Sequence, residues 1–122
     1  MKILFVDDDP VTLDLMGQAA RLLGYEATLA RNGAAAIQHA NEEHPELIFL
    51  DLMMPDMDGL SVLKKLKGDA VTADIPVIIL SAGASYDDHQ VCMDAGANGY
   101  MYKPVPLAEL MSTFKKYENG NK

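Results

Sequence analysis

Cysteine, basic charge and long apolar runs are all scarce in this chain of 122 residues. Cys92 is the single cysteine, so no internal disulfide can form, and we expect it to be a small buried hydrophobe. Ten Lys and Arg are scattered among 18 Asp and Glu, and the net charge of −8 argues against direct binding of nucleic acid. The longest apolar runs, four or five residues, cannot span a membrane, and residues 1–6 lack the apolar stretch of a signal peptide. We therefore expect a cytoplasmic protein.

The length and the order of the segments predict one α/β domain. A chain of 122 residues with 49% hydrophobic residues is long and apolar enough for a single core. Strand-like and helix-like segments alternate, with strands expected at 2–7, 26–30, 47–51, 76–81 and 100–102 and helices at 10–23, 33–43, 60–67, 86–95 and 106–117. Five such units predict a doubly wound five-stranded parallel sheet in the order 2-1-3-4-5, with five flanking helices. Residues 1–117 would form this domain and residues 118–122 a polar tail.

The first predicted helix has a clear start. Pro10 suits the first turn, and Asp9 suits the capping position before it. Leu15, Ala19 and Leu22 follow at helical spacing, and we expect this apolar stripe to face the sheet.

Carboxylates stand at the ends of two predicted strands. Asp7 and Asp8 follow the apolar run 3–6, and Asp51 follows the run 47–50. The carboxyl ends of parallel strands share one edge of the sheet, where ligands bind in open α/β folds. Carboxylates gathered there repel one another by roughly 3 kcal/mol per pair at ~5 Å and an effective dielectric of about 20. A divalent cation with oxygen ligands, such as Mg²⁺, would compensate for this repulsion.

Two further polar residues stand at the ends of neighbouring strands. Ser81 ends the fourth strand and Lys103 follows the fifth. A hydroxyl and an ammonium suit a phosphoryl group, while a carboxylate beside a metal can serve as a nucleophile. The strand ends together predict a site that forms an aspartyl phosphate.

Other metal and phosphate motifs fit the sequence poorly. An EF-hand on Asp56 and Asp58 would need an acid at Met54 and a Glu at Lys65. A phosphatase of the haloacid dehalogenase kind would need a second Asp where Met53 stands. No phosphate-binding loop of the GxxxxGK[ST] type occurs, so nucleotide binding is unsupported.

The three histidines lack metal-ligand spacing. His39, His44 and His89 also have no obvious acidic partners in the sequence. We expect all three to be solvated.

The motifs taken together resemble the receiver domain of response regulators in two-component signalling. The resemblance rests on the segments 6–10, 50–59, 80–82 and 103–104 and on their spacing, and it extends along nearly the whole chain. Any one of these segments alone would be weak evidence for the family, but their combination is highly specific.

The resemblance implies roles for the acids. Asp51 would be the phosphoacceptor, attacking a phosphohistidine of a sensor kinase or phosphotransfer protein. Asp8 and Asp51 would bind Mg²⁺ directly, together with the backbone carbonyl of Met53. Asp7 would act mostly through a coordinated water.

The resemblance also implies how the signal is passed on. Ser81 would donate a hydrogen bond to a phosphoryl oxygen, and Lys103 would pair with the phosphoryl group or with Asp51. Tyr100 would be an aromatic switch that turns inward on phosphorylation, changing a surface within residues 86–117 on which an effector protein docks. The bond from Lys103 to Pro104 would be cis.

The implied activity is that of a signalling switch that catalyses its own phosphorylation and dephosphorylation, not of a turnover enzyme. A small metal-dependent aspartyl-phosphate phosphatase and an adaptor that binds its partner unphosphorylated remain as alternatives. Met53 and Gly83 flank the expected path of the hydrolytic water and bind it weakly, so we expect no acceleration of self-dephosphorylation by either. Nothing after Tyr117 resembles an output domain, so the chain is expected to be either a stand-alone regulator or part of a longer one.

Overall fold

The computed structural model describes residues 1–54, 58–82 and 86–118, except for the side chains of residues 86–88. The described chain forms, in order, β1 (Lys2–Val6), α1 (Pro10–Leu22), β2 (Glu26–Ala30), α2 (Gly33–Glu43), β3 (Leu47–Asp51), α3 (Gly59–Gly68), β4 (Val77–Ser81), α4 (Tyr86–Asp94), β5 (Gly99–Tyr102) and α5 (Leu107–Glu118). Each boundary lies within one residue of the prediction. The alternation of strands and helices is therefore confirmed.

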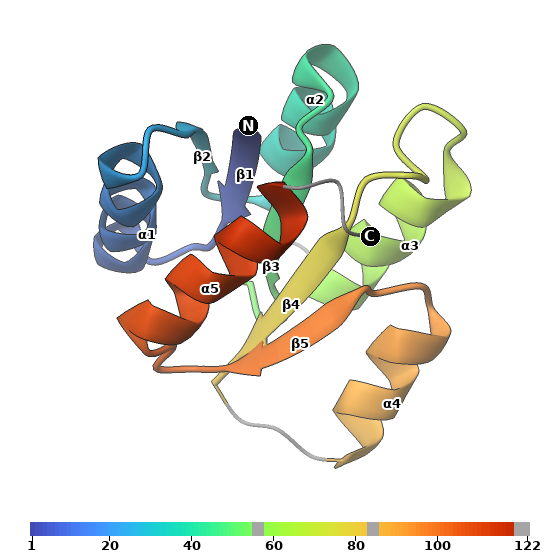
Figure 1. The fold of residues 1–122 in the computed structure, drawn as a ribbon. Helices are drawn as coiled ribbons and strands as arrows, with labels where there is room; N and C mark the ends of the chain where they lie inside the picture. The colour runs from blue at the N-terminus through green and yellow to red at the C-terminus, as the bar shows by residue number, and fades with distance from the viewer. Residues whose placement is uncertain (55–57, 83–85, 119–122) are drawn as a thin grey trace.

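The strands form one parallel sheet between two layers of helices. The strand order is β2-β1-β3-β4-β5, as predicted. Helices α1 and α5 cover one face, and α2, α3 and α4 lie on the other (Figure 1). Strands β3 and β4 are buried at every position, which explains their uninterrupted apolar sequences. The carboxyl ends of β1, β3, β4 and β5 consequently meet at one edge.

Each face of the sheet has its own hydrophobic core. Under α1 and α5 the core is aromatic: the rings of Phe5 and Phe49 stack at 5.3 Å, and Phe114 of α5 meets both edge-on. The opposite core is aliphatic and includes Val62 and Leu66 of α3, both almost completely buried. These two cores fix the strands against which the polar edge is built.

The predicted apolar stripe of α1 is wrong for two of its three residues. Ala19 is 3% exposed, but Leu15 is 63% and Leu22 is 80% exposed. The buried side of α1 instead contains Leu13, Met16, Gly17 and Ala20, of which the two small residues let the helix lie close to the sheet. A Cβ on Gly17 would lie 3.2 Å from the Leu29 side chain. The buried side of this helix thus combines large apolar residues with small ones, and hydrophobicity alone does not distinguish it from the side that carries Leu15 and Leu22.

The start of α3 is packed directly against the end of β3. The Asp58 side chain caps α3 by accepting a hydrogen bond from the backbone N–H of Leu60 at 2.8 Å. Gly59 donates its N–H to the Leu52 carbonyl at 2.8 Å, and a Cβ on Gly59 would lie 2.5 Å from the Asp51 carbonyl oxygen. Only glycine allows this approach, which fixes the backbone that carries Asp51.

The structure also shows the bond before Pro104, the single cysteine and the end of the last helix. The bond from Lys103 to Pro104 is cis, and Cys92 is a buried thiol in the aliphatic core, as expected. Glu118, assigned to the tail from sequence, is the last residue of α5, and its carboxylate accepts a hydrogen bond from the Tyr25 hydroxyl. The rest of the predicted tail, 119–122, lies outside the described residues.

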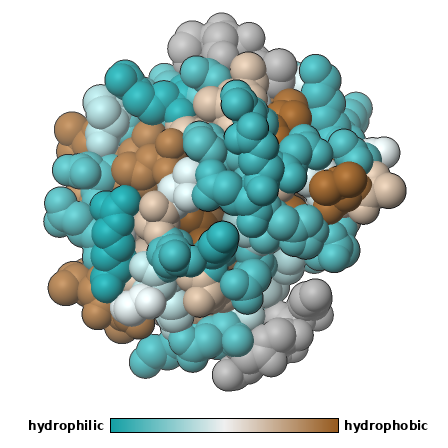
Figure 2. All heavy atoms as spheres, turned by 90° about the horizontal axis from the view of Figure 1, so that it is seen from above, coloured by the Kyte–Doolittle hydropathy of each residue, from teal (hydrophilic) through white to brown (hydrophobic). Residues whose placement is uncertain are grey.

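The surface is mainly polar at the end where β1 begins. Figure 2 shows the molecule from the top of the view in Figure 1. Hydrophilic side chains cover most of the coloured surface, and hydrophobic ones form small separate patches. Within the described part of the chain, no helix has the length and apolar content to cross a membrane.

Candidate functional site

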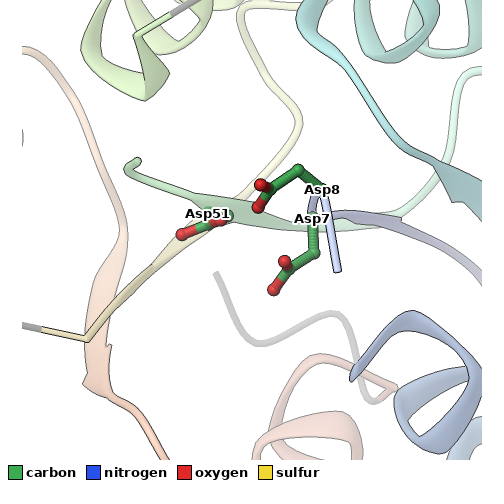
Figure 3. Close-up of side chains that lie close together, drawn as sticks. All are labelled: Asp7, Asp8 and Asp51. Atoms are coloured by element: carbon green, nitrogen blue, oxygen red, sulfur yellow. The ribbon is translucent and has the colours of Figure 1, made fainter. Parts of the chain in front are cut away.

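Three carboxylates meet at the carboxyl edge of the sheet. Asp7 and Asp8 follow β1, and Asp51 is the last residue of β3. One carboxylate oxygen from each lies within 4.8 Å of the others. Asp7 and Asp51 are buried, whereas Asp8 is exposed, and the three side chains extend into the same space beyond the strands (Figure 3). The sequence prediction that these acids gather is confirmed.

Backbone pairing brings the other two predicted site residues to the same edge. Ser81 is the fully buried last residue of β4, and β4 lies between β3 and β5. The N–H of Leu52, just after β3, donates to the Leu80 carbonyl at 2.9 Å. The N–H of Lys103, just after β5, donates to the Ser81 carbonyl at 2.7 Å. The end of β4 is therefore tied through the backbone of Leu80 and Ser81 to the residues that follow both neighbouring strands.

The ammonium of Lys103 bridges two of the acids. Its Nζ lies 2.6 Å from Asp7 Oδ2 and 3.4 Å from Asp51 Oδ1. The expected pairing with Asp51 is present, but Asp7 is the nearer partner, which the sequence did not suggest. Because all three side chains are largely shielded from water, these ion pairs are stronger than surface ones.

Burial dominates the electrostatics of the site. Loss of hydration, followed by the negative charge of Asp7, raises the pKa of Asp51 above its usual range, and Lys103 only partly opposes this. Burial lowers the pKa of Lys103, but the hydrogen bond to Asp7 and the two carboxylates outweigh it and leave the pKa raised. The site thus holds a carboxylate whose negative charge is only partly compensated next to a firmly protonated amine.

Short turns after β1 and β3 orient the buried acids. Asp7 Oδ1 accepts a hydrogen bond from the Asp9 N–H at 2.9 Å, and Asp51 Oδ1 accepts one from the Met53 N–H at 3.3 Å. Asp9 itself caps α1, accepting from the backbone N–H of Val11 at 3.2 Å, as predicted. The division between the cap and the two site acids that precede it is therefore visible in the structure.

The donor set suits a hard divalent cation. Asp7, Asp8 and Asp51 offer only oxygen ligands, and the exposure of Asp8 leaves one side open for water. Oxygen ligands with room for retained waters are what Mg²⁺ requires, so the residues present fit that ion. The side chain of Met53, which comes two residues after Asp51, is 70% exposed at the rim of this site, whereas Gly83 lies outside the described residues.

The prediction that all three histidines are solvated is wrong for His39 and His89, which are half-buried, whereas the His44 side chain is 52% exposed. His39 lies 2.7 Å from Glu43, four residues along α2, a spacing that was visible in the sequence. His44 lies 3.5 Å from Asp74, a partner that only the tertiary fold brings near. His89 packs its ring against Tyr100, again a contact between distant parts of the sequence.

Comparison with known proteins assigns this arrangement to a family. Residues 3–115 match the family model described as response regulator receiver domain. The transcriptional regulatory protein PrrA of Mycobacterium leprae is 42% identical over 93% of this chain, which covers 48% of PrrA. The polar-differentiation response regulator DivK of Brucella ovis is 33% identical, with 94% of each chain covered. A CheY-like receiver domain from Methanospirillum hungatei has a TM-score of 0.91 at 28% identity, covering 98% of this chain and 94% of its own.

Proposed function

The chain belongs to the response regulator receiver family of two-component signalling, and we propose that Asp51 is its phosphoacceptor. The observation that supports this most directly is a buried carboxylate at a strand end, flanked by two further acids and a lysine. In this proposal the phosphoryl group comes from a phosphohistidine of a sensor kinase or phosphotransfer protein.

The transfer would be catalysed by residues of this chain. A carboxylate oxygen of Asp51 attacks phosphorus, an O–P bond forms, and the N–P bond breaks with its electron pair remaining on the donor imidazole. Lys103, already 3.4 Å from Asp51, would offset the negative charge of the phosphoryl oxygens. In the later hydrolysis a water oxygen would attack the same phosphorus, the O–P bond to Asp51 would break with its electron pair on the carboxylate, and inorganic phosphate would leave. The domain would thus catalyse its own phosphorylation and dephosphorylation.

We propose Mg²⁺ as the cofactor. When bound, Mg²⁺ would neutralise charge shared between the acids and the phosphoryl oxygens. Asp8 and Asp51 would hold it directly with the Met53 carbonyl, and Asp7 would hold it through a water. The hydrogen bond from Asp9 N–H and the ion pair to Lys103 keep Asp7 fixed for that task.

The signal would pass from the site to β5. The Ser81 hydroxyl would donate a hydrogen bond to a phosphoryl oxygen, and Tyr100 would respond as the aromatic switch. Backbone hydrogen bonding of Lys103 to Ser81 supports a coupled movement of the β4 and β5 ends. An effector protein would then read the altered surface within residues 86–117.

The phosphodonor would use the face between α1 and α5, which includes part of the range 86–117. An apolar groove of about 600 Å³ lies there, and Lys103 belongs to both the groove and the site. The exposed side chains of Leu15, Leu22 and Leu107 line this groove, so a helical phosphodonor could cover them while its phosphohistidine reaches Asp51. This role would account for the two leucines of α1 that face away from the core.

The chain spans about half the length of the curated relatives it matches first. We propose that the described domain acts by protein docking in the cytoplasm, with no direct contact to nucleic acid or membrane. The net charge of −8 supports the first of these exclusions.

The test is intact mass after treatment with acetyl phosphate and Mg²⁺. The wild-type chain is expected to gain one phosphoryl group, and Asp51→Asn is expected to gain none. Asp14→Asn, which removes an exposed acid of α1, serves as the control and should be phosphorylated normally. Labelling of Asp51→Asn to the wild-type level would exclude Asp51 as the acceptor. Continuous turnover of a phosphate ester by the wild type would indicate the phosphatase alternative.

A further inference from the structure

A histidine of α4 is in contact with the proposed switch residue. The ring of His89 meets that of Tyr100 edge-on, with centroids 4.8 Å apart and an interplanar angle of 71°. Tyr100 in turn lies 5.3 Å from Tyr102, two residues along β5. Three rings therefore form a row from α4 to the edge strand, beside which α4 lies in Figure 1.

His89 is one of two points at which the described side chains of α4 are shielded from solvent. Cys92 is buried in the aliphatic core and His89 is half-buried, whereas Gln90, Val91, Met93 and Asp94 are exposed. Among the described side chains of α4 only these two are shielded, so each of the two contacts has a large share in fixing the position of residues 89–94. His89 therefore links the placement of α4 to that of β5.

Tyr100 occupies an inward position in this structure. Its hydroxyl oxygen is buried, and its ring packs against the aliphatic core. In the pairing of β4 with β5, Tyr100 lies beside Ile79, and Tyr102 lies beside Ser81 two residues further along. The ring that would respond to Ser81 is thus the ring that His89 covers.

We propose that His89 is a positioning residue that stabilises the inward position of Tyr100 and so sets the balance of the switch. The proposal rests on the roles of Asp51 and Tyr100 proposed above. Outward rotation of Tyr100 would break its ring contact with the imidazole, because His89 is held on α4 by the neighbouring anchor at Cys92. Edge-on aromatic pairs of this geometry change a two-state equilibrium by about 2- to 10-fold.

The experiment follows Tyr100 directly by ¹⁹F NMR of chain labelled with 3-fluorotyrosine. Loss of one signal in Tyr100→Phe assigns the resonance, and beryllofluoride with Mg²⁺ mimics phosphorylation. His89→Ala and His89→Gln both remove the ring, His89→Phe restores one, and Gln90→Ala alters the exposed neighbouring position. Each chain is measured with and without beryllofluoride.

In the ring-free variants, the ratio of outward to inward Tyr100 is expected to rise by about 2- to 10-fold, which shifts its signal toward that of the solvent-exposed position. His89→Phe should return the signal to its wild-type position, and Gln90→Ala should leave it unchanged. Identical Tyr100 signals in wild type, His89→Ala and His89→Gln would overturn the proposal, as would failure of His89→Phe to restore the signal. Because the wild-type ring is already inward, the response to beryllofluoride is read in the ring-free variants. Tyr100 signals of His89→Ala and His89→Gln that lie outward and ignore beryllofluoride would count against the proposed function of Asp51, and the two failures are therefore distinguishable.

Discussion

Replacing Asp51 with Asn is expected to stabilise the metal-free chain at neutral pH while leaving its stability near pH 4 unchanged. Asn keeps the shape of Asp51 but removes a negative charge that is only 3% exposed to solvent. Because burial and the charge of Asp7 disfavour that charge, the folded wild type keeps a proton on Asp51 at a pH where the unfolded chain has lost it.

The size of the effect follows from the pKa. Burial and then Asp7 raise the pKa of Asp51 from 3.8 to about 6. A pKa difference of about 2 corresponds to roughly 3 kcal/mol. Since the folded-state value lies above the unfolded one, the stabilising contribution is complete below about pH 4 and is lost as the pH rises through about 6. Asp51→Asn does not undergo this loss and should gain roughly 1–3 kcal/mol over the wild type at neutral pH.

The assay is urea unfolding in EDTA from about pH 4 to about pH 8. Asp14→Asn also removes one negative charge, but from the exposed surface of α1, and so controls for general charge effects. Mg²⁺ should close the gap, because a ligand at a hundred times its dissociation constant adds about 2.7 kcal/mol to a chain that binds it. Equal or lower stability of Asp51→Asn at neutral pH in EDTA would refute the electrostatic reasoning.

Three further predictions concern other parts of the domain. Gly59→Ala should destabilise by about 1–3 kcal/mol in urea unfolding, since its Cβ would lie 2.5 Å from the Asp51 carbonyl oxygen. Gly68→Ala, with no atom within 4 Å of its Cβ, should cost nothing, and equal losses in both would contradict this packing argument. Met53→Asn should speed loss of the phosphoryl group by about 5-fold, the value of one added hydrogen bond to water, and an unchanged rate by timed mass measurement would be contrary evidence. Tyr25→Phe should lose about 1 kcal/mol with the hydrogen bond to Glu118. Because that bond and burial raise the pKa of Tyr25 to about 12, the loss should disappear as the pH rises from about 10 through 12, and a difference that persists there would count against it.

The sequence predicted the sheet and its polar edge because both depend on local order. Apolar runs identify buried strands, and in a parallel sheet the residue that ends each run must lie at the shared edge. Asp51, Ser81 and Lys103 could be placed together for that reason alone. The helix faces were less accessible: on α1 the apolar residues exceed the width of one stripe, and Leu15 and Leu22 are as hydrophobic as the buried residues.

Contacts between side chains from distant elements could not be predicted from the sequence. Lys103 pairs most closely with Asp7, 96 residues away, because the lysine side chain is long enough to reach either acid from the end of β5. The contact of His89 with Tyr100 depends on how α4 lies against the edge strand, which no local pattern determines. Both contacts require the distance between two elements, whereas the residue pattern gives only the order of the elements.

Phosphorylation would reverse the electrostatic problem of the site. A buried carboxylate that disfavours its single charge would become an acyl phosphate with more negative charge, so the groups able to oppose it must come closer. Among the residues that the structure describes, Lys103 is the basic group in contact with Asp51, and its backbone N–H donates to the Ser81 carbonyl at 2.7 Å. Movement of one would therefore displace the other, and with them β5, the strand that carries Tyr100. Because α4 contacts this strand through His89, the displacement would reach the helix at the ring contact between His89 and Tyr100. That contact is weak enough to be altered by a chemical change at Asp51.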